Sequence, residues 1–302
     1  MHSCASSEKS GNGSDKFNKP TSWLHLCYWE VKTLAFPNLF NVMISIIVFV
    51  VGVAIVYLSS KALKLRPKPI AIAEPRKEAT PVFLVVVATF VLTSILVVFT
   101  NTVFIPTFQL DKRPPFTFDV INVLWTAFSY AVWFLVLTLG MKKTGQNLGS
   151  IGISGENKGR MLALGLIPSV VYVTVAGFVA PSLGGGFNGL SSSLVYGLIV
   201  YTLVGFSEEI VWRGYVQTRL IALSGTSKGL VTTAMLFALF HFPTRFYLYS
   251  GVALEGLVSA ILLFPVSLLF GYMMLRSQNI IPSSIFHLLV NWSTLFWQIP
   301  TF

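Results

Sequence analysis

The chain has 302 residues, of which 54% are hydrophobic and only 11% are charged. In soluble domains about a quarter of the residues are charged, and one soluble core of this length could not bury so much apolar surface. The composition excludes an ordinary soluble enzyme and predicts an integral, multi-pass membrane protein, located in the cell membrane if the source is prokaryotic. The net charge is +10, and many basic residues lie in short loops between apolar runs. This placement favours contact with the lipid bilayer surface and argues against nucleic acid as a partner.

The first 37 residues form a segment of their own. Residues 1–21 are rich in Ser, Gly, Asn and Lys, whereas residues 22–36 place apolar side chains at helical spacing. We expect a disordered start followed by a short helix that lies at the membrane interface.

Apolar runs of roughly membrane-spanning length follow one another along the rest of the chain. About 20 apolar residues suffice for a helix to cross a bilayer. We therefore predict an all-α fold, a polytopic transmembrane helical bundle of about eight spans. The runs are Leu39–Leu58, Pro81–Ile105, Val120–Met141, Met161–Ala180, Leu194–Gln217, Leu230–Phe242, Val252–Leu275 and Ile280–Ile299.

The distribution of basic residues predicts how these runs are oriented in the membrane. The segments that follow runs 1, 3, 5 and 7, together with the end of run 5, hold 14 Lys and Arg residues, against 7 on the opposite side. Since cytoplasmic loops are enriched in Lys and Arg, we expect the first group to be cytoplasmic and both termini to face outward.

Buried ionisable groups are confined to the C-terminal half. Among eleven acidic residues, only Glu208 and Glu209 lie well inside an apolar run, in GFSEEIVWRGY, and His241 and His287 lie in runs 6 and 8. Polar groups inside a membrane are costly, so they are functional candidates. We therefore divide the chain into the N-terminal segment 1–37, spans 1–4 in 38–190 and a catalytic core in 191–302. In the N-terminal spans, Asn101, Asn122 and Tyr130 are interpreted as helix contacts.

Spacing suggests separate roles for these groups. Glu209 and Arg213 are four residues apart with Glu first, which favours an ion pair that neutralises both. Glu208 lies about 100° around the helix, so it is the free carboxylate and the candidate general base. His287 and Asn291 share one helix face and could bind a water, an oxyanion or a carbonyl. Depth along the helices allows the groups to meet in a cavity open to the cytoplasm.

Three motifs, EEIVWRG, FALFH and HLLVN, occur in this order on separate runs. They resemble the Glu-Glu-x-x-x-Arg, Phe-x-x-x-His and His-x-x-x-Asn/Asp motifs of the CAAX-protease and bacteriocin-processing (CPBP, or Abi) family of intramembrane peptidases. The resemblance covers roughly residues 195–296, and no motif position departs from the pattern.

The resemblance implies an intramembrane endopeptidase that acts on a peptide or lipidated-protein substrate near the cytoplasmic face. Eukaryotic relatives remove the last three residues of a prenylated CAAX tail. Glu208 is implied to activate water. The other implied site residues are His241, His287 and Asn291, with Glu209 and Arg213 as their support.

Two other functions remain open on the sequence alone. One is a non-proteolytic immunity or scaffold protein that kept the site. The other is a proton-coupled transporter, although a transporter should show paired discontinuous helices in two related halves.

The sequence also leaves open whether the reaction requires a metal ion. Glu208, His241 and His287 could ligate zinc and leave a position for water. No His-Glu-x-x-His motif is present, so we favour a mechanism that needs no metal.

Overall fold

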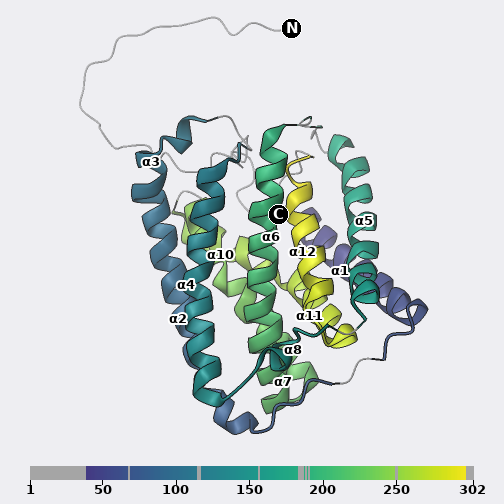
Figure 1. Cartoon of the computed structure of the whole chain (residues 1–302). Helices are drawn as coiled ribbons and strands as arrows, with labels where there is room; N and C mark the ends of the chain where they lie inside the picture. The colour runs from purple at the N-terminus through teal and green to yellow at the C-terminus, as the bar shows by residue number, and fades with distance from the viewer. Residues whose placement is uncertain are drawn as a thin grey trace, which may run out of the picture.

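The computed structural model describes residues 39–66, 69–113, 117–155, 157–182, 187, 189, 191–248 and 251–296. The predicted disordered and interfacial segment 1–37 lies outside these residues. Long helices run side by side between two ends of a bundle (Figure 1). The all-α, multi-pass class predicted from the sequence is confirmed.

The helices in the N-terminal half are α1 (Leu39–Ala62), α2 (Pro75–Phe99), η2 (Thr100–Phe104), α3 (Ile105–Thr107), η3 (Leu110–Lys112), α4 (Val120–Thr144), η4 (Leu148–Ile151) and α5 (Lys158–Ser182). The helices in the C-terminal half are α6 (Ser192–Glu209), η5 (Ile210–Gln217), α7 (Thr218–Ser224), α8 (Thr226–Phe240), α9 (Phe242–Leu248), α10 (Ala253–Ile261), α11 (Phe264–Ser277) and α12 (Ile281–Ser293). Helices α2, η2 and α3 are continuous, as are α6, η5 and α7.

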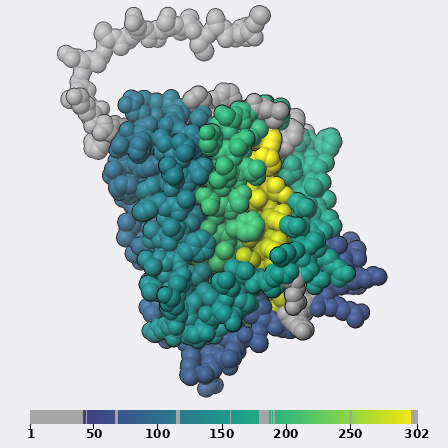
Figure 2. Space-filling view, in the orientation of Figure 1, coloured from purple at the N-terminus to yellow at the C-terminus, as the bar shows by residue number. Residues whose placement is uncertain are grey.

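Six of the eight predicted runs form helices that are long and apolar enough to cross a membrane within the described part of the chain. The other two runs form α8 and α12, with 15 and 13 residues. These helices are shorter than the roughly 20 residues that span the hydrocarbon core. Helix α12 packs between α5 and α6 (Figure 2), so protein shields it on both of these sides.

The loops that follow runs 1, 3, 5 and 7 gather at one end of the bundle, the lower end in Figure 1. Arg276 donates to the Ser60 hydroxyl at 2.8 Å, the Ile70 amide donates to Gln278 at 2.9 Å, and Arg219 donates to the Ser150 carbonyl at 2.8 Å. The grouping agrees with the alternating direction predicted for the spans. The cytoplasmic location of this end stays a prediction.

The division at residue 190 also stays a prediction. Helices α4 and α5 of the N-terminal half pack directly against α6 and α12 of the C-terminal half.

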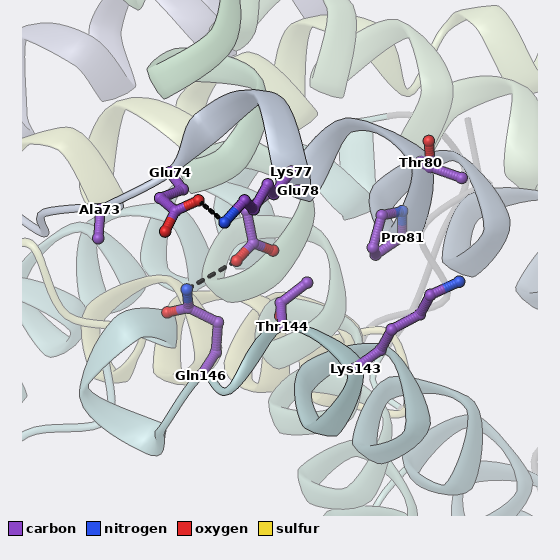
Figure 3. Close-up of a pocket in the computed structure, with 9 residues that line it drawn as sticks. All are labelled: Ala73, Glu74, Lys77, Glu78, Thr80, Pro81, Lys143, Thr144 and Gln146. Atoms are coloured by element: carbon purple, nitrogen blue, oxygen red, sulfur yellow. Dashed lines mark hydrogen bonds and ion pairs between the residues drawn. The ribbon is translucent and has the colours of Figure 1, made fainter.

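A buried ion pair that the sequence interpretation missed lies at the end of the bundle where these loops gather, which we call the basic end. Glu78, in the first turn of α2, is only 1% exposed, and its Oε2 lies 3.6 Å from Nε of the buried Arg219. The Gln146 amide donates to Glu78 Oε1 at 2.6 Å beside a pocket between α2 and α4 (Figure 3). Arg219 also donates to the Ser150 hydroxyl at 2.8 Å. The pair therefore ties α2 to α7 and to the segment around η4.

Replacing Glu78 by Ala should destabilise the protein strongly, because the Arg219 guanidinium then stays buried without a carboxylate. Removing one partner of a buried pair costs about 3–5 kcal/mol. The matched control is Glu74→Ala, since Glu74 pairs with Lys77 one turn away on the surface. Exposed pairs contribute about 1 kcal/mol or less. The free energy of unfolding of both purified variants checks this, and equal losses would contradict the structural role of Glu78.

Candidate active site

Two adjacent carboxylates end helix α6. Glu208 and Glu209 are its last two residues, and the chain continues directly into the π-helix η5. Hydrogen bonds in a π-helix link residues five apart, and such segments are frequent at functional sites. Both carboxylates are buried, with exposed fractions of 5% for Glu208 and 0% for Glu209.

Glu208 faces three polar side chains, which come from α4, from the C-cap of α8 and from α12. The Tyr130 hydroxyl of α4 donates to Glu208 Oε1 at 2.8 Å. Glu208 Oε2 lies 3.8 Å from His241 Nε2 and 3.9 Å from His287 Nε2. These two distances are too long for direct hydrogen bonds and suit a single shared water. Glu208 Oε2 has no hydrogen-bond partner among the described residues.

The other ring nitrogen of each histidine is occupied. His241 Nδ1 lies 2.8 Å from the Phe237 carbonyl oxygen, and His287 Nδ1 lies 3.2 Å from Glu209 Oε1. Because both partners are acceptors, each Nδ1 carries the proton and donates. Both Nε2 atoms are therefore free of these partners and face Glu208 Oε2.

Glu209 forms the predicted ion pair and also positions a histidine. Its Oε1 lies 3.1 Å from Arg213 Nη1, and both side chains are fully buried. Arg213 donates to the Ser267 hydroxyl at 2.9 Å and to the Ser267 carbonyl at 3.2 Å. The same Glu209 oxygen accepts from His287, so one carboxylate links α6, η5 and α12.

Aromatic rings enclose this ion pair. The Arg213 guanidinium lies 4.1 Å from the Phe237 ring centre and 5.0 Å from that of Phe270. Phe270 also stacks on His287, with ring centres 4.7 Å apart. Aromatic rings this close stabilise a buried guanidinium, and the stacked Phe270 ring limits the rotation of the imidazole.

Five of the six predicted site residues meet in one cluster, and Asn291 lies beside it. Asn291 is one turn beyond His287 on α12 and partly exposed. Its side chain makes no hydrogen bond among the described residues, so its role stays a prediction. The sequence interpretation missed the role of Tyr130, which it took for a helix contact, and that of Ser267. For Tyr130, a polar hydroxyl in the middle of an apolar run was the available signal.

Close approach of α6 and α12 brings His287 to the carboxylates. Gly205 lies one turn before Glu209, and a Cβ atom added there would meet the Leu288 amide at 3.0 Å and the Ser284 carbonyl at 3.1 Å. Small residues let backbones approach in this way inside membranes. Gly205 thus permits the contact between His287 and Glu209.

Replacing Gly205 by Leu should push α12 away from α6. The added side chain would meet backbone atoms that cannot move independently, and overpacking of this kind costs about 1–3 kcal/mol. Gly159→Leu is the matched control, because a Cβ atom at Gly159 meets nothing within 4 Å. Unfolding midpoints of the two variants provide the measurement. The inferred close approach is wrong if Gly205→Leu is as stable as Gly159→Leu.

One family model matches the C-terminal part of the chain. Residues 190–293 match the model described as type II CAAX prenyl endopeptidase Rce1-like. A search of curated proteins finds no match. The matched segment runs from α6 to α12 and contains all six predicted site residues, whereas Tyr130 lies before it. The resemblance predicted from the three motifs is therefore confirmed: residues 190–293 of this multi-pass membrane protein are similar to the type II CAAX prenyl endopeptidases.

Proposed function

We propose that the protein is an intramembrane endopeptidase in which Glu208 activates a water for attack on a peptide carbonyl. The observation that carries this proposal is the position of Glu208 Oε2. It lies 3.8 and 3.9 Å from the Nε2 atoms of His241 and His287. One water can donate to Glu208 Oε2 and to one Nε2 atom, and it can accept from the other Nε2 atom when that histidine carries a second proton, which holds the water next to a base.

In the proposed reaction Tyr130, Glu208 and a histidine have separate roles. The Tyr130 hydroxyl holds Glu208 Oε1, so Oε2 accepts the proton as the water oxygen adds to the carbonyl carbon. The histidine that carries this second proton, on Nε2, stabilises the resulting oxyanion by donating to it. Glu208 then passes its proton to the amide nitrogen as the carbon–nitrogen bond breaks, which yields a carboxylic acid and an amine.

Access to the site supports a reaction with water. The His241 side chain is 21% exposed, whereas those of Glu208 and His287 are each 7% exposed. Water and substrate would therefore arrive beside His241. Asn291, on the same helix as His287, is proposed to bind a carbonyl of the peptide.

The proposed substrate is a peptide or lipidated protein whose scissile bond lies near the cytoplasmic membrane face, as in CAAX-tail processing. The match of residues 190–293 to a prenyl endopeptidase family supports this class. The exposed apolar side chains of α2, α4 and α5 indicate that the protein is surrounded by lipid, through which a prenylated tail could reach it.

Replacing Glu208 by Gln should abolish cleavage and leave the fold intact. The amide keeps the shape of the side chain but cannot accept a proton, so turnover should fall by at least about a hundredfold. The matched control is Glu255→Gln, which removes a carboxylate of α10. Mass spectrometry of membrane-proximal peptides from cells that carry each variant gives the cleavage products. A folded Glu208→Gln protein with normal turnover would refute the proposal and favour a different base.

A zinc-assisted form of the same reaction is the second candidate. Histidine ligands of metals usually donate their other N–H to a carboxylate or a carbonyl, as His287 and His241 do here. Glu208, His241 and His287 would hold such an ion, which would activate the water as a Lewis acid.

The separations between these atoms favour the mechanism without a metal. Tetrahedral zinc with bonds of about 2.1 Å sets its ligand atoms about 3.4 Å apart, which is less than the 3.8 and 3.9 Å found here. Within the described ranges, no three His, Cys, Asp or Glu side chains are grouped closely enough to hold a metal ion.

Activity should therefore survive treatment with a strong chelator. The purified protein should carry much less than one zinc per chain by elemental analysis, and His287→Ala should not change its zinc content. Loss of cleavage with the chelator and recovery with added zinc would establish the zinc-assisted form instead. That result would leave Glu208 in the site as a metal ligand.

A further inference from the structure

A pocket of about 320 Å³ lies at the basic end of the bundle, away from the candidate active site. Its lining consists of Ser60, Lys61, Lys64, Leu65, Arg66 and Arg276. Four of these side chains are cationic, and the lining contains no acidic residue. In the described part of the chain, none of the four cations forms an ion pair with a carboxylate.

The end of α1 builds one wall of this pocket. The Leu65 amide donates to the Ser60 carbonyl at 3.1 Å, and the Lys64 amide donates to the Lys61 carbonyl at 3.0 Å. These two bonds form a Schellman turn, in which the left-handed position is usually glycine. Here Lys64 occupies that position with φ +51°. The turn places Lys61 and Lys64 beside the same pocket, although Lys64 has a conformation that is unfavourable for a side chain.

Arg276 of α11 forms the opposite wall and is fixed there. Its Nε and Nη2 donate to the hydroxyl of Ser60 at 3.0 and 2.8 Å, and that hydroxyl donates to the Tyr57 carbonyl at 2.8 Å. Ser60 is fully buried. The Tyr57 ring lies 4.6 Å from Lys61 Nζ and 5.5 Å from Arg276 Cζ. The guanidinium is therefore oriented by neutral groups, and no carboxylate of the described residues pairs with it.

The pocket lies at the level where two spans leave the membrane. The span that includes α1 ends at Ala62, and the span that includes α11 ends at Ser277. Phosphate groups of lipids lie at this boundary. Arginine binds phosphate through two parallel hydrogen bonds, and lysine binds it as a point charge. A bound anion would also relieve the repulsion among four neighbouring cations.

We propose that this pocket binds a phosphate-bearing anion, either the headgroup of an anionic lipid or free phosphate. The ligand's phosphate would contact Arg276 and the two lysines and would join α1 to α11. The site is independent of Glu208 and of the proposed peptidase activity, so its test needs no substrate.

The test uses the full chain in nanodiscs. One sample contains dioleoyl phosphatidylcholine alone, the second adds dioleoyl phosphatidylglycerol, and the third adds inorganic phosphate to phosphatidylcholine nanodiscs. The thermal unfolding midpoint is measured at increasing amounts of each anion. Stabilisation by phosphatidylglycerol identifies a lipid headgroup as the source, and stabilisation by inorganic phosphate alone identifies the free anion. No stabilisation by either overturns the proposal.

Paired variants separate the pocket from the general basic surface. Lys61→Gln with Lys64→Gln should weaken anion binding about tenfold or more, because each basic side chain near an anionic surface contributes about fivefold in affinity and two are removed. The control is Lys142→Gln with Lys143→Gln, which removes two exposed lysines from the last turn of α4 at the same end. The control should bind the anion within about twofold of the unmodified chain, because Lys142 and Lys143 do not line the pocket and solvent and salt screen exposed charges at a distance. Equal losses in both pairs would overturn the proposal.

A further variant, Lys64→Gly, removes a cation of the pocket without destabilising the fold, so it separates weaker binding from misfolding. Glycine adopts a positive φ without strain, so this variant should be at least as stable without anion as the unmodified chain. It should nevertheless bind the anion several-fold more weakly. Unchanged binding by Lys64→Gly would remove Lys64 from the site and overturn the proposed pocket.

Discussion

The Glu209 carboxylate is the group on which the rest of the site depends. A fully buried charge inside a membrane is tolerated only when an opposite charge and hydrogen bonds compensate it. Arg213 supplies that charge from the next turn, and His287 donates to the same oxygen from α12. The compensation of one charge therefore also fixes the orientation of a histidine that faces Glu208. Glu209 Oε1 therefore contributes both to the packing of the helices and to the proposed chemistry.

A second buried ion pair lies at the basic end of the continuous helix formed by α6, η5 and α7. Arg213 in η5 and Arg219 in α7 each pair with a buried carboxylate, and each donates to a serine on another segment. The partner serines are Ser267 of α11 and Ser150 of η4. The helix that carries the two site carboxylates is thus held at two levels by fully buried guanidinium groups. Such anchoring keeps catalytic side chains within the narrow range of geometry that a reaction needs.

The anion pocket depends on charges that the fold leaves uncompensated. Between Glu209 and Arg213, a cation and an anion meet inside the bundle. At the end of α1, cations gather in a pocket whose lining holds no carboxylate, beside the ends of two candidate membrane spans. Because α11 carries both Arg276 and Ser267, the same helix contacts the pocket at one end and the Arg213 support further along.

Periodicity and spacing alone determined much of this protein. Apolar runs predicted the membrane spans, because a bilayer requires about 20 apolar residues in a row. The four-residue spacing predicted the pair of Glu209 with Arg213, because a helix brings such residues together. Tertiary structure decided the partners of groups far apart in the chain: Tyr130 on Glu208, Glu78 on Arg219, Arg276 on Ser60, and α12 against Gly205. These contacts depend on how helices pack, and local sequence patterns carry no information about which distant side chain faces which.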